Sequence, residues 1–152
     1  AIAGMVVTAS YSDSQTKTVT DYSCSPTTFS TIGNQVVTVS YTENGVTQTA
    51  TLNVTVNRKS VTKPTWKSNL TYTGSAQSVS SASYWNNYNT SYMTIGGTTS
   101  ATNAGTYIAT FIPGSNYRWT DGTTTAINVN WTINKATGSL SVNPTTVAIV
   151  PA

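Results

Sequence analysis

The alternation of apolar and polar residues is clearest in residues 35–56, QVVTVSYTENGVTQTATLNVTV, which predict a β-hairpin. Asn44 and Gly45 predict a two-residue type I′ turn, because both tolerate the positive φ angles that this turn requires. The turn fixes the register, which pairs Glu43 with Val46, Thr42 with Thr47, Tyr41 with Gln48, Ser40 with Thr49, Val39 with Ala50, Thr38 with Thr51 and Val37 with Leu52. One face of this hairpin is mostly apolar and the other carries hydroxyl groups, so a second sheet is needed to cover the apolar face.

Further short strands with the same period of two are expected along the rest of the chain. They are predicted in residues 5–11, 16–19, 60–66, 70–74, 76–80, 93–95, 103–114, 117–123 and 126–135. No stretch of ten residues has apolar positions at helical spacing, so helix is predicted to be almost absent. Short strands separated by turn residues indicate an all-β fold made of antiparallel β-sandwiches.

An internal repeat divides the chain. Residues 31–33, which lead into the alternating residues 35–39, correspond in sequence to residues 103–105, which lead into residues 107–111. LNVTVN at residues 52–57 likewise corresponds to VNWTIN at residues 129–134. We therefore expect one domain in residues 1–57 and a second in residues 58–136, with residues 137–152 opening a third.

Composition limits the classes of partner. Only 7% of the 152 residues are charged, so the polar surface must consist of Ser, Thr, Asn and Gln. Arg58, Lys59, Lys63 and Lys67 cluster at the expected domain junction, where charges on a strand edge discourage pairing with other strands. This cluster is too sparse for a nucleic-acid site. We therefore expect no nucleic-acid binding. No apolar run approaches the roughly 20 residues of a membrane span, so we also expect no membrane insertion.

The residue types that usually carry catalysis are scarce. The chain has no histidine and one cysteine, which nearly excludes a zinc site and leaves few groups for general base catalysis. Asp13 and Asp21 could at most share one calcium ion, which usually needs more carboxylates. Cys24 alternates with Tyr22, which favours a buried thiol over a nucleophile. We expect no enzymatic activity, no cofactor and no metal site.

The best candidate for a binding site is the loop of residues 83–92, SYWNNYNTSY. The candidate ligand-binding residues are Tyr84, Trp85, Asn87, Tyr88 and Tyr92. Flat aromatic faces mixed with amide groups suit sugar rings and adaptable protein contacts. The alternative is structural, with Tyr84 and Tyr92 finishing strands and Trp85 capping the end of a sandwich.

Several motifs carry a family resemblance. GMVVTASYSDSQTKTVTDYS followed by GNQVVTVSYTENGVTQTATLNVTV, within residues 4–57, resembles the bacterial immunoglobulin-like (Ig-like) domains of the group 3 kind. LTYTGSAQSV, TTSATNAGTYIATF, YRWTDGTT and WTINKA resemble the Ig-like repeats that accompany them, and the C-terminal segment resembles the start of a group 2 domain. The resemblance implies tandem Ig-like antiparallel β-sandwiches in an extracellular protein, on a bacterial cell surface or in a phage virion.

The resemblance also implies a non-catalytic structural or adhesion role, as a spacer and weak multivalent binder. Its expected partners are neighbouring Ig-like modules of the same or an adjacent chain, and host-cell or cell-wall glycans. The alternative function is a carbohydrate-binding module that uses residues 83–92. Group 3 domains usually have a strand before the Gly-Met-Val-Val motif, whereas only residues 1–3 precede Gly4 here. Either the chain is a piece of a longer protein, or a strand such as residues 139–150 of a neighbouring chain fills the gap.

Overall fold

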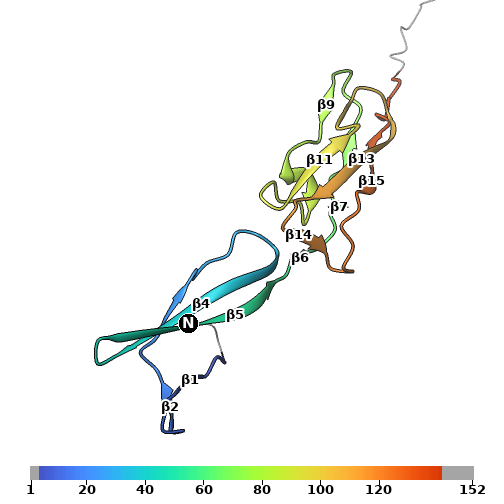
Figure 1. Cartoon of the computed structure of the whole chain (residues 1–152). Helices are drawn as coiled ribbons and strands as arrows, with labels where there is room; N and C mark the ends of the chain where they lie inside the picture. Colours follow the sequence, from blue (N-terminus) through green and yellow to red (C-terminus); the bar gives the residue numbers. More distant parts are fainter. Residues whose placement is uncertain (1–3, 142–152) are drawn as a thin grey trace, which may run out of the picture. The chain divides into compact units, whose positions relative to one another are not determined.

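A computed structural model of the chain describes residues 4–141, and its secondary structure is almost entirely β (Figure 1). These residues form fifteen strands and one short 3-10 helix, η1 (Ala82–Tyr84), with no α-helix among them. The all-β fold predicted from the alternation is therefore confirmed. Most of the expected third module, residues 142–152, lies outside the described residues.

The chain divides into two compact units. The first comprises Ala1–Val61 with Gly114–Thr123, and the second comprises Thr62–Pro113 with Thr124–Ala152. The first expected boundary is at residue 57, and the observed division is at Val61. The segment Gly114–Thr123, expected in the second module, belongs to the first unit.

The first unit contains three small sheets. Its strands are β1 (Val7–Ser10), β2 (Thr16–Val19), β3 (Ser23–Ser25), β4 (Gly33–Glu43), β5 (Val46–Val56), β6 (Lys59–Val61) and β14 (Tyr117–Trp119). β1 and β2 form a short antiparallel hairpin, β3, β4 and β5 form an antiparallel sheet in that order, and β6 pairs with β14. The two predicted hairpins, at residues 5–19 and 35–56, are both present.

The long hairpin has the predicted register throughout. Glu43 faces Val46 across the turn, and Val37 faces Leu52. Asn44 and Gly45 have φ angles of 51° and 77°, as the type I′ turn requires. A turn of two residues leaves no freedom to slip, so the alternation in the sequence determines which face each side chain takes.

The second unit is built around one four-stranded sheet. Its strands are β7 (Thr65–Trp66), β8 (Leu70–Thr71), β9 (Gln77–Ser78), β10 (Trp85–Asn86), β11 (Met93–Gly97), β12 (Ser100–Ala101), β13 (Gly105–Pro113) and β15 (Ile127–Asn134). The order in the main sheet is β11-β13-β15-β8, and two-stranded sheets are formed by β7 with β10 and by β9 with β12. The apolar face of the main sheet holds the buried residues Ala109, Phe111, Trp131 and Ile133.

The internal repeat reappears in the pairing of the strands. β4 begins at Gly33, which faces Val56, and β13 begins at Gly105, which faces Ile133. These residues are equivalent in the repeat, so the β4–β5 and β13–β15 ladders share one register. Along the first seven residues of β4 and of β13 the order of exposed, half-buried and buried positions is also the same. Each unit is therefore organised around a copy of the same ladder.

The sheets differ from expectation in two details. β6 with β14 and β8 with β15 are short parallel pairs, whereas antiparallel pairing was expected throughout. The strand expected at residues 60–66 is interrupted between Val61 and Thr65, where Pro64 cannot donate a backbone hydrogen bond. β6 and β7 therefore pair with different strands.

Candidate functional site

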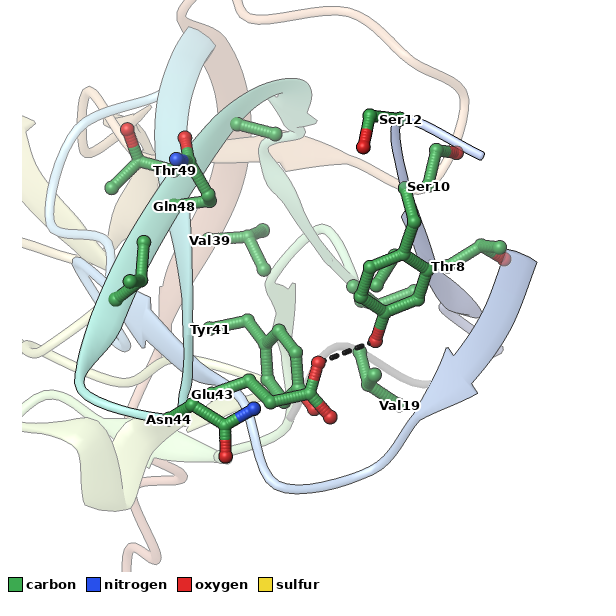
Figure 2. Close-up of a pocket in the computed structure, with 15 residues that line it drawn as sticks. Thr8, Ser10, Ser12, Val19, Val39, Tyr41, Glu43, Asn44, Gln48 and Thr49 are labelled. Carbon is green, nitrogen blue, oxygen red and sulfur yellow. Dashed lines mark hydrogen bonds between the residues drawn. The ribbon is translucent and has the colours of Figure 1, made fainter. Parts of the chain in front are cut away.

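A groove with a volume of about 530 Å³ lies in the first unit between β1 and the β4–β5 hairpin (Figure 2). The predicted apolar face of the hairpin forms its floor. Val37 and Val39 on β4 are buried, but their cross-strand neighbours on β5 are not: Leu52, opposite Val37, is 37% exposed, and Ala50, opposite Val39, is also exposed. The apolar face of the hairpin is therefore buried along β4 and left exposed along β5.

The wall of the groove is the edge of β1. Six consecutive residues, from Val7 to Ser12, line the groove. Because alternate side chains of a strand point to opposite faces, a strand that lines a space with consecutive residues presents its edge to it. β1 pairs with β2 and with no other described strand, so this edge has free backbone donors and acceptors for a further strand.

A polar cluster closes the end of the groove next to the Asn44–Gly45 turn. The Lys17 ammonium on β2 lies 2.8 Å from Glu43 Oε1 and donates to the Tyr41 hydroxyl at 3.4 Å. The Tyr11 hydroxyl donates to Glu43 Oε2 at 2.5 Å, and this bond is the dashed line at Glu43 in Figure 2. The cluster joins the β1–β2 hairpin to β4, and it leaves the Glu43 carboxylate with its charge already paired.

The cluster changes the pKa values of its members. Hydrogen bonds from Lys17 and then from Tyr11 lower the pKa of Glu43 from 4.5 to about 2. The bond from Lys17 to Glu43 also raises the pKa of the lysine, and the bond from Tyr11 to Glu43 raises the pKa of the Tyr11 phenol. Since the carboxylate is the form favoured by folding, its contribution to stability is complete above pH 4.5 and is lost as the pH falls through about 2.

We expect a carboxyl titration of Glu43, followed by NMR, to give a pKa of about 2 in the intact chain. In Lys17→Met the largest cause of this shift is removed, so the pKa should rise toward 4.5. High salt should act in the same direction, because the pair is at the surface and salt screens it. A pKa that stays near 2 in Lys17→Met would contradict this account of the cluster.

The loop predicted as a binding site lies in the second unit, where Trp85 is a core residue. Its side chain is 2% exposed, and its indole Nε1 donates to the Val79 carbonyl at 2.7 Å. Its ring makes edge contacts with Trp66 at 5.0 Å and with Phe111 at 4.8 Å between ring centroids. Trp85 therefore has almost no exposed ring surface, and ligand binding through it stays a prediction.

The other four predicted residues are more exposed than Trp85. Tyr84, Tyr88 and Tyr92 are half-buried, and Asn87 is exposed with a φ angle of 59°. Tyr84 stacks on Trp66 at 6.3 Å, and Tyr88 makes an edge contact with Phe111 at 5.3 Å. Burial raises the pKa of the Tyr88 phenol. Tyr84 and Tyr88 thus pack on the aromatic core, and all three tyrosines keep part of their surface open. Ligand binding by them stays a prediction.

Residues of catalytic or metal-binding types are scattered in the structure. Asp13 and Asp21 are exposed, and the Asp13 carboxylate accepts a bond from the backbone N–H of Gln15 at 3.0 Å. Cys24 is a half-buried free thiol. Among residues 4–141, no three His, Cys, Asp or Glu side chains come together as a metal site would need, and no helix could cross a membrane.

Sequence alone could not locate the groove, although the apolar face of residues 46–52 pointed toward its floor. In comparisons with known proteins, no family model, no curated protein and no solved structure matches this chain.

Proposed function

We propose that this chain is a non-catalytic structural and adhesion module of a multi-domain bacterial cell-surface protein or phage virion protein. In this proposal the two units are tandem Ig-like β-sandwiches that act as spacers. The observation that supports it most is the shared register of the β4–β5 and β13–β15 ladders. A ladder that recurs along one chain is typical of an array of related modules, which adds length without new chemistry.

The surface chemistry supports the same role. The outward face of the long hairpin carries threonine and serine side chains in cross-strand pairs, such as Thr42 with Thr47, whose hydroxyls are 2.8 Å apart. Hydroxyl groups keep an array hydrated when only 7% of its residues are charged. Such modules bind weakly one at a time, and their contacts add through effective concentration when many copies are displayed together.

The second candidate function is carbohydrate binding through residues 83–92. The observation that favours it is the partial exposure of Tyr84, Tyr88 and Tyr92 around the exposed amide of Asn87. Aromatic rings with neighbouring amides suit the apolar faces and hydroxyls of sugars. Burial of Trp85 removes the largest ring from this surface.

One experiment separates the two candidates: binding of the full chain to immobilised bacterial cell-wall glycan, first as single molecules and then biotinylated on tetrameric streptavidin. An adhesion module should bind weakly alone and gain about 10²–10⁴-fold in apparent affinity when displayed. Tight binding by single molecules, with NMR shifts at Asn87 and Tyr88, would instead support the carbohydrate-binding module. Absence of binding in both forms would contradict adhesion to this glycan.

A further inference from the structure

The two copies of the ladder differ in how well their apolar faces are covered. Residues of β5 are more exposed than the equivalent residues of β15. Ala50 and Leu52 are exposed, whereas their equivalents Ile127 and Val129 are half-buried. Val54 is half-buried, whereas its equivalent Trp131 is fully buried. The register is shared but the side chains differ, so the difference reflects both the larger side chains of β15 and what lies over each face.

In the second unit the cover over β15 comes from β7. Trp66 of β7 lies 5.9 Å from Trp131 between ring centroids, and the preceding Pro64 is fully buried. In the first unit no described strand takes this position over β5, and the groove is found beside it. The free edge of β1 lies along the same groove. A strand added to that edge would extend the β1–β2 sheet across the exposed face of β5.

The sequence contains a second segment of the same kind as the one that forms β7. Residues 60–66 are SVTKPTW, and residues 141–147 are SVNPTTV. Both contain Ser-Val followed, within three residues, by Pro-Thr. If the residues TTVAIV after Pro144 were extended, Val147 and Ile149 would point to one side, since alternate side chains of a strand share a face. The segment 145–150 has six residues, the same number as the stretch from Val7 to Ser12 that lines the groove.

Charge also fits this segment to the groove. Residues 139–150 contain no charged side chain. The charge of Glu43 at the end of the groove is already paired with Lys17, so an uncharged strand leaves no ion without its partner. Leu140, which lies just before the segment, is 94% exposed.

We propose that the groove binds residues 145–150 of a second copy of this chain, as a strand added along the free edge of β1. Val147 and Ile149 would then cover the exposed side chains of Val46, Ala50 and Leu52. Such contacts are head-to-tail, since the groove of one copy takes the tail of another, and they link copies into chains or closed rings. The inference depends on the groove and the tail alone and goes beyond the proposed function.

Complementation between two full-length variants tests the proposal. Ala50→Arg fills the groove and leaves residues 145–150 unchanged. Ile149→Asp places a charge in residues 145–150 and leaves the groove unchanged. In sedimentation velocity the unmodified chain should associate increasingly with concentration, and each variant alone should stay monomeric. An equimolar mixture of the two should form a one-to-one complex, because one intact groove can meet one intact tail.

Two further variants control for the fold. Thr51→Arg places the same charge one residue along β5 on the opposite, exposed face, so its association should equal that of the unmodified chain. Val46→Arg changes a second exposed residue of the groove and should repeat the loss seen with Ala50→Arg. The proposal is overturned if the unmodified chain is monomeric at every concentration. It is also overturned if Ala50→Arg still associates, or if the mixture of variants yields only monomers.

Discussion

Phe111→Ala should cost the second unit about 3–5 kcal/mol of unfolding free energy, the usual range for removing a buried phenylalanine. The ring is fully buried at the centre of the aromatic core. It makes edge contacts with Trp85 at 4.8 Å and with Tyr88 at 5.3 Å. These neighbours are themselves fixed by other contacts, so the cavity left by the ring cannot close fully. A domain is stable by only about 5–15 kcal/mol, so the second unit should come close to unfolding.

Urea denaturation followed by tryptophan fluorescence measures this effect, because Trp66, Trp85 and Trp131 all lie in the second unit. Ile112→Ala is the matched control. Ile112 is the next residue of β13, is 50% exposed and points to the opposite face. Its replacement should change stability by about 1 kcal/mol or less. Equal losses in the two variants would show that the aromatic core is not where the stability of this unit lies.

The second large effect is expected for Gly97→Ala. Gly97, the last residue of β11, has a φ angle of 71°, which side chains other than glycine rarely adopt. A Cβ atom there would lie 2.9 Å from the Ile108 carbonyl oxygen and 3.2 Å from the Thr110 backbone nitrogen. Both atoms belong to the backbone of the neighbouring strand β13 and cannot move alone. The left-handed conformation alone costs about 1–3 kcal/mol, and the close approach adds to it.

Gly96→Ala provides the control within the same strand. A Cβ atom on Gly96 meets no atom within 4 Å, and its backbone is not left-handed. This variant should be as stable as the unmodified chain or slightly more stable, because alanine has less freedom to lose on folding. The same urea titration compares the two. If Gly97→Ala unfolded at the same urea concentration as Gly96→Ala, β11 would not be held against β13 at this point.

The sequence was sufficient where a local rule determines the structure. Asn44 and Gly45 permit one kind of turn, and the register of all the pairs between β4 and β5 follows from it. The repeat then predicts the frame of β13 and β15, although a long connection separates these strands. The register of β4 with β5 follows from two neighbouring residues, and the register of β13 with β15 follows from the repeat of the same sequence pattern.

The sequence was insufficient where the answer depends on contacts between distant residues. Trp85 lies in a stretch rich in tyrosine and asparagine that was predicted as a loop, but it forms strand β10. Its burial depends on Val79, Trp66 and Phe111. The parallel pairing of β8 with β15 joins residues more distant still. The groove lies where Tyr11 and Lys17 are bonded to the end of β4 while the neighbouring residues of β5 stay exposed. The alternation of apolar and polar residues in β5 is compatible with either a buried or an exposed apolar face.

The two ladders, alike in register, differ in how soon they can form. β4 and β5 are joined by two residues, so the first ladder can zip from its turn on the microsecond timescale of an isolated hairpin. β13 and β15 are separated by residues 114–126, and closing that longer loop carries a larger entropy cost before any pair forms. Local contacts form faster than distant ones, so the first unit should acquire its ladder early in folding and the second should acquire its ladder late.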